Sequence, residues 1–175
     1  MKALNNIGLQ ESGRFGLRFL LILALCALLF EWFEGAIAVL HMLPVSIGAA
    51  ALMRVARVEA LLDTSTLGLG HCVIDVADVT YLVTHECTGI YALFLLVAAV
   101  LAYPASQGAV GRGLLLGIPA LYAFGALRLF ILGAVAQVRP DWIGLFHEYV
   151  MEVVSVAFVI YVWVYWIDHI VDRRG

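Results

Sequence analysis

The sequence predicts an all-α integral membrane protein, folded as one helical bundle over residues 1–175. Apolar residues make up 64% of the chain, charged residues only 13%, and the mean hydropathy is +1.02. These values lie far from those of an ordinary soluble domain. The formal net charge of -3, carried by few charged residues, argues against a nucleic-acid partner.

Long apolar runs are the second observation behind this fold class. A spanning helix needs about 20 mainly apolar residues, because the hydrocarbon core is roughly 30 Å thick and unpaired backbone groups are costly there. Four runs meet this requirement. The predicted spans are residues 15–33, 89–107, 113–138 and 149–167.

Residues 36–62 are harder to assign. The stretch begins without charges, but it carries His41 and Pro44 and leads into Arg54 and Arg57. We expect it to be re-entrant or interfacial, with an amphipathic helix over residues 49–62. Alternatively, this stretch is an additional span. The bundle is thus expected to have about four spans, with five or six as alternatives.

Positive charges predict the orientation, because short cytoplasmic loops of membrane proteins are enriched in Lys and Arg. They place both termini and the loop 104–113 inside, and Cys87 and the connection 137–148 outside. The expected location is the plasma membrane, the inner membrane of the cell. The residues that carry this assignment are Lys2, Arg14, Arg18, Arg112, Arg173 and Arg174.

Residues 68–84 differ from the apolar runs around them. They are rich in β-branched residues with partial alternation, and they begin with Gly68 and Gly70. We expect a short extended segment on the outer face, with a hairpin as an alternative. Such a cap would hold Cys87 at the outer end of the span 89–107.

Three reactive side chains are expected to meet at this outer face: Cys87, Arg128 and His147. Cys87 and His147 each stand just before a span. Arg128 lies inside one, about 22 Å from the expected start at Gly113, and its long side chain can reach toward the outer surface. An ionisable residue inside a span indicates function, because burying it is expensive.

A thiol, an imidazole and a guanidinium are the parts of a cysteine acyl-transfer site. Thiols attack as thiolates, which a neighbouring imidazole or cation favours. We therefore expect Cys87 to be the nucleophile and His147 the general acid and base. Arg128 would stabilise the oxyanion or hold a substrate carboxylate. No cofactor and no metal ion are expected.

Several alternatives stay open at this stage. His85 competes with His147 as the base, and a disulfide between Cys72 and Cys87 would silence the site. An ion pair would also explain the arginine, and its candidate acids are Glu86, Glu148 and Glu152. A metal site has donors of suitable type, but their spacing matches no strong zinc pattern. These donors are His71, Cys72, His85 and Cys87.

The competing function classes differ in which residues they need. A non-enzymatic scaffold or transporter subunit would pair Arg128 with an acid and would not need Cys87. A thiol-redox or metal-binding membrane protein would use Cys72 and Cys87 together and could dispense with Arg128.

The chain resembles the exosortase and archaeosortase family of membrane transpeptidases. The resemblance covers about residues 61–166 and rests on Cys87-Thr88-Gly89-Ile90 after an extended segment, Leu127-Arg128-Leu129, and His147 before the last span. It implies cleavage of a C-terminal sorting signal from exported proteins and transfer of the new carboxyl end to an acceptor. That signal is a short motif, a transmembrane helix and a basic tail.

By this resemblance Cys87 is the nucleophile, His147 the acid and base, and Arg128 the transition-state stabiliser. The chain departs from the family in two ways. Many members have Asn three residues before the arginine, where this chain has Gly125, and the chain is short for the family. A small, dedicated subtype is the expectation.

Overall fold

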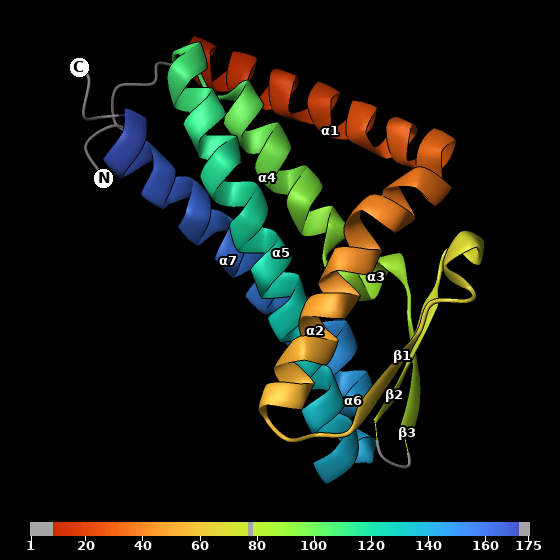
Figure 1. Cartoon of the computed structure of the whole chain (residues 1–175). Helices are drawn as coiled ribbons and strands as arrows, with labels where there is room; N and C mark the ends of the chain where they lie inside the picture. Colours follow the sequence, from red (N-terminus) through yellow and green to blue (C-terminus); the bar gives the residue numbers. More distant parts are fainter. Residues whose placement is uncertain (1–8, 77–78, 172–175) are drawn as a thin grey trace.

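A computed structural model describes residues 9–76 and 79–171 of the chain (Figure 1). Over these residues the protein is mostly helical, with one small sheet. The helices are α1 (Leu9–Ile37), α2 (Leu43–Val55), α3 (His85–Thr88), α4 (Ile90–Ala102), α5 (Gln107–Val138), α6 (Ile143–Leu145) and α7 (Met151–Trp166). The strands are β1 (Ala60–Asp63), β2 (Cys72–Val76) and β3 (Val79–Val83).

Three described helical stretches are long and apolar enough to cross a membrane: 12–37, 107–138 and 140–171. The last of these joins α6 and α7 through the π-helical segment Phe146–Val150. The span expected at 89–107 corresponds to α4, which has 13 residues and ends at Ala102. Its length of about 20 Å is shorter than the roughly 30 Å hydrocarbon core.

The connection between α4 and α5 is shorter than the loop expected at 104–113. α5 begins at Gln107 because Ser106 caps it, its hydroxyl accepting a hydrogen bond from the backbone N–H of Ala109 at 3.3 Å. The helix therefore begins six residues before Gly113, the predicted start of this span. Measured from the observed start, Arg128 lies about 32 Å along α5.

Small residues let α5 run through the middle of the bundle. A Cβ at Gly117 would overlap Leu96 of α4, and a Cβ at Gly125 would lie 2.5 Å from the carbonyl oxygen of Thr88 in α3. Helices in membranes commonly pack through such small residues, because close approach increases van der Waals contact. Gly125 therefore fixes α3 directly against α5.

The sheet is antiparallel with the strand order β1-β2-β3, and Cys72 of β2 pairs with Val83 of β3. Alternate side chains of β2 are buried, as expected for a strand with one covered face. That face belongs to the same buried cluster as the α2 residues Val45, Ala49 and Met53. The sheet is thus held against α2, and β3 leads directly toward α3.

The extended segment expected at 68–84 contains β2 and β3, which pair as a hairpin. The amphipathic helix expected over 49–62 is wrong beyond Val55. Arg57 adopts a left-handed backbone conformation with φ 59°, which a helix cannot continue. The chain turns there and enters β1 at Ala60.

One end of the bundle, here called the aromatic end, is closed by Phe15, Tyr103 and Trp163, whose ring centroids lie 5.9–6.4 Å apart. Trp166 donates a hydrogen bond from its indole N–H to the carbonyl of Ala109 at 2.8 Å. The start of α1, the α4–α5 connection and the end of α7 therefore lie together, with α3 at the far end of α4 (Figure 1).

Candidate functional site

Cys87 and His147 lie in direct contact. Sγ of Cys87 is 2.9 Å from Nε2 of His147, although the two residues are 60 positions apart in the chain. A nucleophile within hydrogen-bond distance of an imidazole is the arrangement required for proton transfer from thiol to base. The structure thus brings together two of the three residues that the sequence singled out.

The Cys87 thiol is placed by the junction between sheet and bundle. Thr84, directly after β3, accepts a hydrogen bond from the backbone N–H of Cys87 at 3.1 Å, and its hydroxyl lies 3.4 Å from Sγ. Gly89 ends α3 with φ 80°, a left-handed conformation that favours glycine. Cys87 is thus fixed from both sides, with 7% of its surface exposed.

His147 lies in the π-helical segment Phe146–Val150, between α6 and α7. Single π turns inside longer helices are frequent at functional sites, because they change the direction of one side chain. The His147 side chain is half-buried. Within the described part of the chain, no side chain hydrogen-bonds its Nδ1, so Cys87 and His147 form a dyad there.

Arg128 is buried, with 1% of its surface exposed, and it faces α7. Its guanidinium donates to Oε1 of Glu152 at 2.6 Å and to Oγ of Ser155 at 3.1 Å. Its Nε is buried without a hydrogen-bond partner. The ion pair expected as an alternative for this arginine is therefore present, and its acid is Glu152.

The arginine does not share a hydrogen bond with either member of the dyad in the described residues. The ion pair is nevertheless linked to the dyad through the helices that carry its two residues. Arg128 lies one helical turn beyond Gly125, which contacts α3 next to Cys87, and Glu152 lies about one and a half turns beyond His147.

His85, the alternative base, is directed toward α1. Its Nε2 lies 3.4 Å from Oε1 of Glu34, and its ring packs edge-on against Phe30 with centroids 5.0 Å apart. A Cβ at Gly70 would lie 3.3 Å from both the imidazole and the carboxylate. His85 therefore ties α3 to α1, while His147 contacts the thiol.

Cys72 occupies an environment different from that of Cys87. Its thiol is fully buried and lies 3.3 Å from Oγ of Ser46. Burial raises the pKa of the Cys72 thiol, which disfavours the thiolate. Both cysteines are free, and the described residues contain no cluster of three potential metal-binding side chains.

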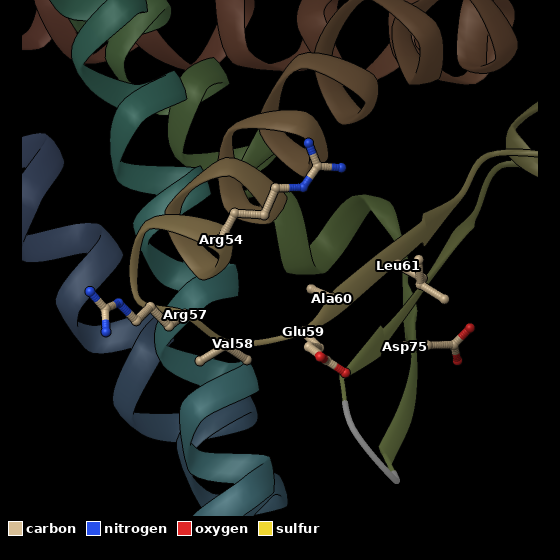
Figure 2. Close-up of a pocket in the computed structure, with 7 residues that line it drawn as sticks. All are labelled: Arg54, Arg57, Val58, Glu59, Ala60, Leu61 and Asp75. Atoms are coloured by element: carbon tan, nitrogen blue, oxygen red, sulfur yellow. The ribbon is translucent and has the colours of Figure 1, made fainter.

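Another hollow lies between the end of α2 and the sheet, with a volume of about 510 Å³. Arg54, Arg57, Glu59 and Asp75 line it, and neither arginine forms an ion pair among the described residues. Figure 2 shows Arg57 and Asp75 pointing in opposite directions. Asp75 instead accepts a hydrogen bond from Thr80 at 2.5 Å. The charged groups do not converge, so the dyad is the better-organised site.

Sequence reasoning missed the groups that support the site, namely Thr84, Ser155 and Glu34. Each is an ordinary polar residue in the sequence, and only the packing of β3, α7 and α1 brings it to its partner. The arrangement of Cys87 and His147 can move a proton between a thiol and an imidazole. The chain matches no known protein family, no characterised protein and no solved structure.

Proposed function

We propose that the chain is a membrane-embedded cysteine peptidase and transpeptidase. The observation that carries the proposal is the 2.9 Å contact between Sγ of Cys87 and Nε2 of His147. The two residues come from separate segments, and each has its own local constraint: the left-handed Gly89 for the thiol and the π turn for the imidazole. Such independent positioning is what a preorganised acyl-transfer site requires.

The proposed reaction has two halves. The Cys87 thiol gives its proton to Nε2 of His147, and Sγ attacks the scissile carbonyl carbon to form a tetrahedral oxyanion. The carbon–nitrogen bond then breaks, and His147 returns the proton to the leaving amine, leaving a thioester on Cys87. An amine acceptor or water attacks the thioester, and the freed thiol regains a proton through His147.

Arg128 supplies positive charge to this region. A guanidinium stays ionised when it is desolvated, so it can stabilise developing negative charge in a site that excludes water. In the structure its charge is balanced by Glu152. We assign to Arg128 the stabilisation of the oxyanion, with Glu152 and Ser155 holding the guanidinium in position.

The proposed substrates are exported proteins that carry a C-terminal motif, a transmembrane helix and a basic tail. This part of the proposal rests on the resemblance of the Cys87, Arg128 and His147 motifs to exosortases and archaeosortases. It is compatible with three helices long enough to cross a membrane. In this scheme the shorter apolar helix α4 is a fourth crossing, so both termini are cytoplasmic and the dyad operates at the outer face.

One observation favours a second candidate function, a non-enzymatic membrane scaffold. The ion pair between Arg128 and Glu152 gives the buried arginine a structural role that needs no chemistry. A scaffold does not need the Cys87 thiol, so substitution of Cys87 distinguishes a scaffold from a peptidase.

The test is C-terminal processing in cells. Wild type and the variants Cys87→Ala, His147→Ala and Arg128→Ala are each co-expressed with exported proteins bearing a C-terminal helix and basic tail. Intact mass then reports cleavage. Loss of processing in all three variants, with Cys72→Ala unaffected, is the expected result. Processing that survives Cys87→Ala would rule out the proposed nucleophile and favour the scaffold.

A further inference from the structure

An apolar groove runs along α4 between α1 and α7. Near the aromatic end it encloses about 250 Å³, and all three helices contribute to its walls. Farther along, a second hollow of about 350 Å³ lies between α1 and α4. Leu95 lines both parts, so the two hollows adjoin.

The groove has the length of a membrane-spanning segment. Its α1 wall extends from Phe15 to Glu31, which corresponds to about 24 Å of helix. This is most of the roughly 30 Å hydrocarbon core. Apart from Glu31, the lining side chains are hydrocarbon or aromatic, with Phe19, Ala27, Phe94, Val156 and Ile160 among them.

One end of the groove is closed and the other leads to the dyad. Phe15 and Trp163 stack with ring centroids 5.9 Å apart at the aromatic end. At the opposite end Phe30 lines the groove and packs on His85, two residues before Cys87. The groove therefore ends next to α3, the short helix that carries Cys87.

α1 is the helix best suited to admit a partner. Only 6% of its apolar window is buried in the molecule, against 33% in each of the other two spans. Figure 1 shows α1 and α7 diverging on either side of α4 away from the aromatic end. The α1 wall thus has little packing to lose when another helix enters.

The dyad end of the groove is acidic. Glu31 lines the groove, Glu34 follows three residues later, and Glu86 is next to His85 in the chain; all three carboxylates are exposed. One of these carboxylates, Glu34, also contacts His85. Lipid acyl chains carry no charge that would complement these carboxylates, whereas a helix with a basic residue at its outer end would complement them.

We propose that this groove receives the transmembrane helix of the protein being cleaved, with a basic side chain at its outer end facing Glu31 and Glu34. The inference rests on the proposed function and specifies how the substrate docks. The helix packs on the α4 side of the groove through van der Waals contact. Its outer flank then places the scissile peptide bond beside Cys87.

Docking is tested by photo-crosslinking from α7 in the full chain carrying Cys87→Ala, which leaves bound substrate uncleaved. A benzophenone amino acid replaces Val156, which lines the groove, or Val153, an exposed residue that does not. The partner is a single-pass reporter with a leucine–alanine helix of about 20 residues and either Lys or Glu at its outer end.

The expected result is a cross-link from position 156 to the Lys reporter, weaker with the Glu reporter and missing from position 153. Glu31→Lys should reverse the preference between the reporters. Equal cross-linking from both positions would overturn the proposal. So would a product at position 156 that contains only lipid or a second copy of the chain.

A second experiment fills the groove with a large side chain. Ala27→Trp places an indole in it, whereas Ala24→Trp changes an exposed alanine of α1 outside the groove lining. Processing of a substrate that wild type cleaves should fall about tenfold or more in Ala27→Trp, because a displaced substrate misses the near-attack geometry. Ala24→Trp should leave it unchanged.

The two arms separate the docking proposal from the catalytic one. Processing that needs Cys87 but tolerates Ala27→Trp would overturn the groove and leave the peptidase function intact. Processing that survives Cys87→Ala would overturn the peptidase function, while the cross-linking arm would still decide whether the helix docks.

Discussion

At the residue scale, the two thiols of the sheet–helix junction are chemically unequal. Cys87 contacts an imidazole, whereas Cys72 is fully buried beside Ser46, where burial raises its pKa. Alkylation by iodoacetamide in a Cys26→Ala background should therefore label Cys87 first. Cys72 should become reactive only as the pH rises above the ordinary thiol range, because only its thiolate reacts.

Intact mass after timed alkylation measures this difference. Cys87→Ala should abolish the early adduct, and Cys72→Ala should leave it unchanged. An early adduct on Cys72 at neutral pH would contradict the assignment of the two thiols.

The close approach of α3 to Gly125 gives a second prediction for a single residue. A Cβ there would lie 2.5 Å from the carbonyl oxygen of Thr88, so Gly125→Ala must push α3 away from α5. We expect a loss of about 1–3 kcal/mol of stability, as for overpacked cores, together with impaired processing. Thermal unfolding in detergent measures the first effect.

The matched control is Gly111→Ala, in the same helix, where a Cβ meets nothing within 4 Å. Its melting temperature should stay unchanged or rise slightly. Equal melting temperatures for both variants would mean that α3 does not need the close approach. An asparagine side chain would likewise have no room at this position, because its Cβ would meet the same carbonyl oxygen.

The pair between Arg128 and Glu152 predicts an asymmetry between two acids. Glu152→Ala removes a hydrogen bond to a buried charge and should destabilise the protein by about 1.5–3 kcal/mol. The neighbouring Glu148 is exposed, so Glu148→Ala should change stability by no more than about 0.5 kcal/mol. Chemical denaturation of both variants checks the difference, and equal losses would argue against the ion pair.

At the element scale, the one-turn helix α3 depends on the left-handed Gly89. A Cβ at this position meets open space, so the cost of Gly89→Ala comes from its φ of 80° and amounts to about 1–2 kcal/mol. We expect Gly89→Asn to cost less, because Asn tolerates this conformation better. Processing and melting temperature should follow the order Gly, Asn, Ala.

If Gly89→Ala processed substrate and melted like wild type, the left-handed turn would not be what holds Cys87 in place. Gly108→Ala is the control, since its added Cβ also meets open space and its φ is not in the left-handed region. It should leave processing unchanged.

Elements could be predicted from the sequence where one local property dominates. Apolar length identified α1, α5 and the stretch 140–171, and β-branched residues identified the hairpin of β2 and β3. β1 was not predictable, because its position follows from the left-handed turn at Arg57 and from pairing with β2. Composition does not encode either feature.

The site could be predicted only in part for the same reason. The positive charges and apolar runs predict a common membrane level for Cys87, Arg128 and His147, and the structure brings the thiol and the imidazole together. The direction of the guanidinium depends on the rotation of α5 about its axis. Hydrophobicity alone does not determine that rotation, so the contact with Glu152 was one alternative among three acids.

At the scale of the whole molecule, the arrangement of the helix ends predicts which surfaces face the same side of the membrane. Asp141, in the connection after α5, and Gly108, near the start of α5, are both exposed and lie at opposite ends of that helix. In a cysteine-free background, a membrane-impermeant maleimide added to intact cells should label Asp141→Cys and not Gly108→Cys. The opposite pattern would contradict an outward-facing dyad.

Formation of a covalent acyl-enzyme on Cys87 is tested by the intact mass of the protein after brief exposure to a processed substrate. We expect a mass increase equal to the substrate fragment before the cleaved bond, localised to Cys87 and removed by hydroxylamine. His147→Ala should prevent the adduct from forming. An adduct that persists in Cys87→Ala, or processing by wild type without any adduct on this thiol, would show that Cys87 is not the nucleophile.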